Sequence, residues 1–200
     1  LPTGSPGKGL PASKLGARRI VSMGRVIASK GVFDEIRCCR KLLDRGWDVE
    51  WLHAGLGSQD DMERGTTLVA ESGLASRFLF VGFVNDVRSL LASADLVVSM
   101  SYAEGLVGYS LLEAIQQGIP VVGPGIDEVT ELLDAGTHLL VAPPGSTEAY
   151  ADAIEAVLAD RDRALLMAGK AKKKVAARLS DDVVYSMLMN HYARVIYAHR

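Results

Sequence analysis

The feature that most constrains the fold is the alternation of short apolar runs with segments of helical periodicity. The apolar runs lie at 18–24, 48–57, 77–82, 95–101, 119–123 and 138–143. Helical segments follow them at 30–46, 59–72, 87–94, 127–136 and across most of 146–198. One more helix is expected to start within 103–114 and to end near 116–118. Short apolar strands that each lead into a helix are typical of a parallel sheet with helices on both faces. The sequence therefore predicts an α/β fold, a doubly wound parallel sheet of about six strands.

The length and composition favour one folded domain behind a tail. The 200 residues are 48% hydrophobic and 23% charged, which is typical of a globular chain with one substantial core. Residues 1–17 are rich in Pro, Gly and Ser and lack an apolar period, so we expect a linker or tail there. Their "GSPGKG" does not complete the phosphate-binding pattern G-x-x-x-x-G-K-[ST]. The folded domain is expected at 18–200.

Charge, cysteine usage and hydropathy argue against several classes of partner. The net charge is −2 and the basic residues are scattered, so we expect no nucleic-acid partner. Cys38 and Cys39 are adjacent and close no useful loop, which predicts free thiols in a reducing compartment. We expect no transmembrane segment, because no run of about 18 apolar residues occurs. The expected location is the cytoplasm, with peripheral membrane attachment of a full-length protein as the alternative.

Four loops are expected to share one site. In doubly wound sheets, ligands bind beyond the carboxyl ends of the strands, at the point where the strand order reverses. The loops that fall there are Gly24–Lys30, Gly55–Ser58, Gly82–Asp86 and Ser99–Gly108. Residues in these loops are therefore the first candidates for function.

Two cations, Arg25 and Lys30, stand in the first loop, at the start of the next helix. A helix N-terminus is already the positive end of a dipole, so such a cluster favours an anion, and phosphate is the usual one. The alternative is a pair of solvated surface cations. In the second loop, Gly55 and Gly57 permit close backbone approach, either to a ligand or for tight packing of strand against helix.

The fourth loop contributes two carboxylates, Glu104 and Glu113. Gly105 and Gly108 allow a ligand to approach the backbone and leave the N–H groups of the helix start free for an anion. Two alternatives stay open. Ser110 and Glu113 also fit a capping box, and Glu104 is an equally good ion-pair partner for the cations of the first loop.

The histidines do not predict a metal site. His53 ends an apolar run and is interpreted as a packed histidine. The others, His138, His191 and His199, are scattered and have no cysteine or carboxylate at the spacing of metal ligands.

Five segments carry a family resemblance. They are "MGRVIASKGV", "HAGLG", "FVGFVNDVRSLLASADLVVSMSYAEG", "SLLEAIQQGIPVVG" and "TELLDAGTHLLVAPPGSTEAYADAI". In this order they resemble the C-terminal, donor-binding domain of retaining GT-B glycosyltransferases, the family called glycosyl transferases group 1 or family 4. The resemblance covers about residues 18–178 and implies a Rossmann-like domain that binds a nucleotide sugar, without a cofactor or a metal ion.

The resemblance also implies roles for particular residues. As catalytic residues, Arg25 and Lys30 would hold the diphosphate and stabilise the leaving group, and Glu104 would meet sugar hydroxyls at the reacting end of the donor. Glu113 would accept bonds from the ribose hydroxyls. The implied donor-binding set is Gly24, Arg25, Lys30, Gly55, Gly57, Gly82, Phe83, Val84, Glu104, Gly105, Leu106, Val107, Gly108, Tyr109 and Glu113.

Three departures from the family pattern qualify the expected function. The two glutamates are spaced E-x8-E in "EGLVGYSLLE" where the family has E-x7-E, and "GPGIDEV" lacks the usual Gly-Gly. The N-terminal acceptor-binding domain of the family is absent from these residues. We therefore expect the donor-binding half of a retaining glycosyltransferase, inactive when isolated. The alternative is a non-catalytic module that binds nucleotide sugars or another partner with the same fold. A sugar-nucleotide epimerase of similar architecture is disfavoured by the two matched glutamates.

Overall fold

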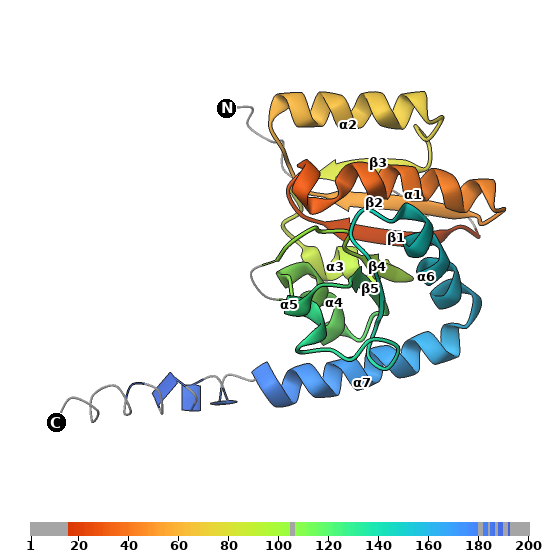
Figure 1. The fold of residues 1–200 in the computed structure, drawn as a ribbon. Coiled ribbons are helices and arrows are strands. Elements are labelled where there is room, and N and C mark those ends of the chain that lie inside the picture. Colours follow the sequence, from red (N-terminus) through yellow and green to blue (C-terminus); the bar gives the residue numbers. More distant parts are fainter. Residues whose placement is uncertain are drawn as a thin grey trace.

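The chain folds around one parallel sheet. The computed structural model describes residues 16–104 and 107–179, together with 182–183, 185–186, 188–189 and 192. The strands are β1 (Arg18–Met23), β2 (Val49–Ala54), β3 (Phe78–Gly82), β4 (Leu96–Val98), β5 (Val121–Pro124) and β6 (Leu140–Ala142). They pair in parallel in the order β3-β2-β1-β4-β5-β6 (Figure 1). The prediction of a doubly wound, six-stranded parallel sheet is confirmed.

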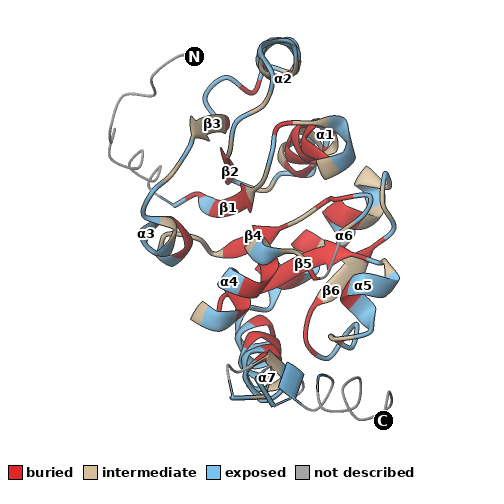
Figure 2. Ribbon diagram, turned by 90° about the vertical axis from the view of Figure 1, so that its left-hand side faces the viewer, coloured by how far each residue is buried: buried red, intermediate tan, exposed pale blue. Residues whose placement is uncertain are grey.

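Helices cover both faces of this sheet. They are α1 (Val32–Asp44), α2 (Gln59–Glu71), α3 (Val87–Ala92), α4 (Tyr109–Gln117), α5 (Asp127–Thr130), α6 (Thr147–Ala159) and α7 (Arg161–Leu179), and a 3-10 turn, η1 (Ala28–Lys30), precedes α1. One buried cluster joins the sheet to α1, α2 and α6, and a second joins it to α3, α4, α5 and α7. Figure 2 shows the buried strands between these two layers.

The central strands explain why the sequence shows apolar runs rather than alternation. Ile20 and Trp51 belong to the first buried cluster, whereas their neighbours Val21 and Leu52 belong to the second. Successive side chains of a strand point to opposite faces. Because both faces are covered here, every position along β1 and β2 must suit a buried environment.

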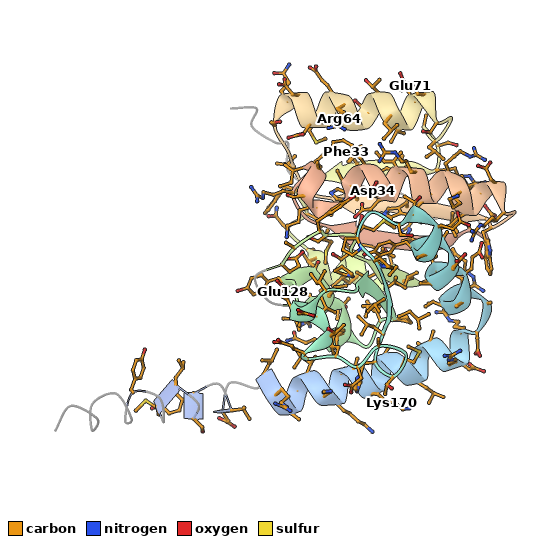
Figure 3. All side chains as sticks on the ribbon, viewed as in Figure 1. Phe33, Asp34, Arg64, Glu71, Glu128 and Lys170 are labelled. Atoms are coloured by element: carbon orange, nitrogen blue, oxygen red, sulfur yellow. The ribbon has the colours of Figure 1, made fainter. Side chains whose placement is uncertain are left out.

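Helix α1 is covered on several sides. It packs between the sheet, α6 and α2, and the Arg64 guanidinium of α2 lies 4.1 Å from the centre of the Phe33 ring on α1 (Figure 3). This position buries both Cys38 and Cys39 as free thiols, as expected. Burial raises the pKa of Cys39 to about 12, so this thiol is unreactive at neutral pH.

Two expected helices differ from the structure or extend beyond it. The segment 127–136 is helical only over α5, because the chain turns at Gly136, which has φ of 77°, and the Asp134 N–H donates to His138 Nδ1 at 3.0 Å. The helices expected across 146–198 are confirmed in α6 and α7, and the described residues between 182 and 192 are helical as well. The rest of that segment, and the expected tail except Gly16 and Ala17, lie outside the described residues.

Candidate functional site

A cleft of about 180 Å³ opens at the carboxyl ends of β1, β2 and β4. It is lined by Met23, Gly24, Lys30, Glu35, His53, Ser99, Glu104, Gly108, Tyr109 and Ser110. Strand β1 pairs with β2 on one side and β4 on the other, so the loops after β1 and β4 leave the sheet in different directions. The cleft lies at this reversal of strand order, where ligands of doubly wound folds bind.

The loops after β1 and β2 touch through their backbones. The Gly24 N–H donates to the Ala54 carbonyl oxygen at 3.0 Å. A β-carbon at Gly55 would lie 1.7 Å from the Gly24 oxygen, and one at Gly57 would lie 2.4 Å from the Val26 oxygen. Both glycines are thus required by contact between two loops, rather than by packing of a strand against a helix.

The two predicted cations have different environments. Arg25 directly follows Gly24, which lines the cleft, and its side chain is exposed. None of the described residues forms an ion pair or hydrogen bond with its guanidinium. In contrast, Lys30 Nζ lies 2.8 Å from Glu104 Oε2, with side chains that are 28% and 13% exposed. The ion-pair alternative for Glu104 therefore holds for Lys30 and not for Arg25.

The N-terminus of α4 faces the cleft without a side-chain cap. Gly108 is the N-cap residue, and the first turn carries no acidic residue. Gly108, Tyr109 and Ser110 all line the cleft. A β-carbon at Gly108 would lie 3.3 Å from Cδ of Glu104, so the Glu104 carboxylate stands beside this helix start. Free N–H groups and the helix dipole make the position suitable for an anion.

The capping-box alternative for Glu113 is wrong. Because α4 begins at Tyr109, Ser110 is already inside the helix and does not cap it. Glu113 is exposed on the second turn and does not line the cleft. Within the described part of the chain nothing pairs with its carboxylate.

A close backbone contact and two hydrogen bonds, none of them indicated by the sequence, hold Lys30 beside Glu104. Gly31 has φ of 76°, and a β-carbon there would lie 2.1 Å from the Met100 carbonyl oxygen. The Tyr102 N–H donates to the Ser29 oxygen at 2.9 Å, and the Tyr102 hydroxyl donates to Asp34 Oδ2 at 2.8 Å. The hydrogen bond to Asp34, labelled on α1 in Figure 3, raises the pKa of Tyr102. The loop after β4 is thereby fixed to η1 and α1.

The floor of the cleft holds a buried polar network. Ser22 and His53 are partners in the β1–β2 register. The Ser22 hydroxyl donates to Glu35 Oε2 at 2.7 Å, and His53 Nδ1 lies 2.8 Å from the same oxygen. These three residues are at most 2% exposed. His53 is a packed histidine, as interpreted, and none of the described residues forms a cluster suited to a metal ion. Glu35 is a functional candidate that the sequence did not indicate, because it resembles any other helical carboxylate until Ser22 and His53 are placed beside it.

The remaining predicted residues that the structure describes in the third and fourth loops are not among those that line the cleft. The Gly82 oxygen accepts from the Gly55 N–H at 2.9 Å, Phe83 is 73% exposed, and Val84 packs against the second buried cluster. None of these three lines the cleft. Val107 is buried, and Gly105 and Leu106 lie outside the described residues. Across the described helices, none is long and apolar enough to cross a membrane.

Comparison with known families and proteins gives a consistent result. Residues 17–160 match the family model described as "Glycosyl transferases group 1". The chain is 31% identical over 179 residues to alpha-D-kanosaminyltransferase of Streptomyces kanamyceticus, covering 88% of this chain and 45% of that protein. It is 30% identical over 191 residues to 2-deoxystreptamine glucosyltransferase of the same organism, covering 94% and 48%. The chain thus spans about half the length of these relatives.

Solved structures share the fold. The Anabaena protein HepE, solved in complex with UDP, superposes with a TM-score of 0.79 at 22% identity, over 88% of this chain and 49% of its own. Sucrose-phosphate synthase from Thermosynechococcus elongatus superposes with a TM-score of 0.82 at 22% identity, over 94% and 47%.

Proposed function

The chain belongs to the group 1 family of glycosyl transferases, and from this premise we propose that its cleft binds a nucleoside diphosphate sugar, as the donor-binding half of a retaining enzyme. The observation that carries the proposal is the convergence at the cleft of Lys30, Glu104 and the uncapped start of α4. Arg25, which has no partner among the described residues, follows Gly24 at the same cleft. The match of relatives named as sugar transferases and a neighbour solved with UDP support it.

The diphosphate is the part of the donor that this arrangement suits best. Arg25 and Lys30 supply positive charge, and the first N–H groups of α4 supply hydrogen-bond donors. A hydrogen bond between a charged group and a phosphate oxygen contributes about 1.5–3 kcal/mol. Because Arg25 has no partner among the described residues, it loses no internal ion pair when an anion binds.

The two members of the Lys30–Glu104 ion pair are proposed to contact different parts of the donor. In the proposed complex, Lys30 turns toward the diphosphate, while Glu104 accepts hydrogen bonds from the sugar hydroxyls. Glu113, exposed on α4, accepts the ribose hydroxyls. The extra residue between the two glutamates leaves Glu104 within reach of the cleft, which it lines.

The proposed reaction transfers the sugar from diphosphate to an acceptor hydroxyl with retention of configuration. The bond between the anomeric carbon and the diphosphate oxygen breaks, a bond to the acceptor oxygen forms on the same face, and the acceptor proton passes to the departing diphosphate. Arg25 and Lys30 stabilise the charge that develops on this leaving group. We further propose that a second domain binds the acceptor, so that the chain alone binds donor but transfers little.

Calorimetric titration with UDP, GDP and ADP tests the donor site. At least one nucleotide should bind below millimolar concentration, and Arg25→Ala should weaken that binding about tenfold, the value of one charge-assisted hydrogen bond. Arg163→Ala, which removes an exposed cation from α7, is the charge-matched control and should bind normally. Failure of all three nucleotides to bind at millimolar concentration would refute the donor-site assignment.

A second candidate function is nucleotide-sugar binding without transfer. The ion pair that already engages Glu104 favours it, because a carboxylate committed to Lys30 is not free for the sugar. Comparing UDP with UDP-glucose separates the candidates. If Glu104 meets the sugar, Glu104→Ala weakens UDP-glucose binding more than UDP binding, whereas an equal effect on both ligands favours the non-catalytic module.

A further inference from the structure

The network beneath the cleft ends on a single backbone carbonyl. His53 Nε2 lies 3.2 Å from the Gly24 oxygen, on the side of the ring opposite Glu35. Gly24 lines the cleft and is followed by Arg25, a cation that pairs with none of the described residues. The Gly24 carbonyl and the Arg25 N–H belong to one planar peptide group. A group that fixes this carbonyl therefore also fixes the direction in which the chain enters Arg25.

The partners of His53 indicate which ring nitrogen donates to Gly24. Nδ1 faces two polar groups, Glu35 Oε2 at 2.8 Å and the Ser22 hydroxyl at 2.9 Å, and that hydroxyl also receives the Trp51 indole N–H. Nε2 faces the carbonyl oxygen of Gly24. A carbonyl oxygen only accepts hydrogen bonds. The geometry therefore makes Nε2–H of His53 the donor to the Gly24 oxygen.

Packing alone does not account for the pair formed by Glu35 and His53. Removing polar groups from water is costly, and apolar side chains of similar volume often stabilise a core as well as a buried polar pair does. What apolar side chains cannot supply is a donor aimed at the Gly24 oxygen. The Gly24 N–H is held by the Ala54 oxygen, but Gly24 has no β-carbon and no other atom lies within 4 Å of where one would stand, so side-chain packing does not fix its carbonyl.

We propose that Glu35 and His53 are positioning residues for the donor diphosphate: they hold the Gly24–Arg25 peptide so that Arg25 is presented to the phosphate. This inference rests on the proposed function. Glu35 orients the ring through Nδ1, and Nε2–H of His53 donates to the carbonyl. The other constraint on the same oxygen is steric, since Gly55 approaches it too closely for any β-carbon. The peptide is thus oriented before the ligand arrives.

The double variant Glu35→Met/His53→Phe tests the proposal. It replaces the two buried polar side chains with apolar groups of similar size, so the fold is expected to survive. It also removes the hydrogen-bond donor to the Gly24 oxygen. If the peptide then takes its binding orientation in only about a tenth of the molecules, UDP should bind about tenfold more weakly. Trp51→Phe is the matched control. It removes the indole donor at the far end of the same network and should lower the melting temperature without changing UDP affinity.

Nuclear magnetic resonance on the nucleotide-free protein supplies a readout that a purely structural role would not move. The 15N shifts of His53 should show a proton on Nε2. The 13C shift of the Gly24 carbonyl should change in the double variant and stay constant in Trp51→Phe. An unprotonated Nε2 in the unmodified chain, or a folded double variant that binds UDP as tightly as the unmodified chain, overturns the proposal.

These outcomes separate the inference from the function on which it rests. If the unmodified chain binds no nucleoside diphosphate, the proposed function fails, and the ring and carbonyl shifts still decide whether His53 holds the peptide. If the unmodified chain binds UDP and the double variant binds it equally well, the proposed function stands and the positioning role fails. Should the double variant not fold, the presence or absence of a proton on Nε2 of His53 in the unmodified chain remains decisive.

Discussion

At the scale of single residues, some glycines are required by close backbone contacts and others are not. Gly55 has φ of 152°, and a β-carbon there would lie 1.7 Å from the Gly24 oxygen. The contact is with backbone, which has little room to move. Gly169 in α7 has no atom within 4 Å of the corresponding position. The same substitution should therefore have opposite effects at these two residues.

Gly55→Ala should lower the free energy of unfolding by about 1–3 kcal/mol, the usual cost of overpacking, and should weaken nucleotide binding by displacing the Gly24 carbonyl. Gly169→Ala should raise the free energy of unfolding by about 0.5–1 kcal/mol, since alanine is favoured over glycine inside a helix. Urea denaturation of both variants measures this. A Gly55→Ala protein as stable as the parent would contradict the loop contact.

The sequence predicted residues of the site only where a local pattern marked their position. Arg25, Lys30 and Glu104 were identified because each stands at a loop that follows a strand. Glu35 was not, because its role depends on Ser22 and His53, which become its neighbours only through the β1–β2 register and the rotation of α1. No local spacing in the sequence indicates that these three side chains are in contact.

At the scale of elements, α5 and the turn after it show where helical periodicity misleads. The segment 127–136 has helical spacing, but only Asp127–Thr130 forms a helix. The Asp134 N–H donates instead to the ring of His138, and Lys174 of α7 forms an ion pair with Asp134 at 2.8 Å. Contacts to another element thus replaced the last helical turn, which a periodicity argument does not anticipate.

The same turn predicts a dependence of stability on pH. Burial lowers the pKa of His138 below its usual value of 6.5, and the charges of Lys174 and Lys170 act in the same direction. The Asp134 carboxylate, 3.1 Å from Nδ1, acts in the opposite direction but is outweighed. The folded chain therefore binds fewer protons here than the unfolded chain. The stability that this neutral ring contributes is present above pH 6.5 and is lost as the pH falls through the lower folded-state pKa.

Urea unfolding between pH 8 and pH 5 should show this loss, with a slope of at most about 1.4 kcal/mol per pH unit for one proton. His138→Asn keeps an acceptor for the Asp134 N–H but does not titrate, so its curve should be flatter below pH 6.5. Comparing the two proteins cancels the contributions of all other groups. Parallel curves would show that His138 is not the group responsible.

At the scale of the whole molecule, the alternation of strands and helices was sufficient to predict the sheet and the edge that carries the cleft. The order β3-β2-β1-β4-β5-β6 places the reversal between β1 and β4, and the cleft lies there. What alternation did not predict is how the loops tie together across the reversal. The contact of Gly31 with Met100 and the bond from Tyr102 to Ser29 join the two halves of the sheet beside Lys30.

This arrangement separates residues that serve binding from residues that also serve stability, and thermal unfolding can distinguish them. UDP at a hundredfold excess over its dissociation constant stabilises a folded chain by about 2.7 kcal/mol, or roughly 5–10 °C for a chain of this size. Arg25→Ala removes a side chain with no partner among the described residues, so the melting temperature without ligand should not change while the UDP shift shrinks.

Lys30→Ala should behave differently, because it leaves the Glu104 carboxylate, which is 13% exposed, without its ion-pair partner. Its melting temperature should fall even without ligand, and the UDP shift should shrink as well. Differential scanning calorimetry of the three proteins with and without UDP gives both quantities. A fall in the ligand-free melting temperature of Arg25→Ala equal to that of Lys30→Ala would mean that Arg25 has a structural partner, and its assignment as the free cation of the donor site would fail.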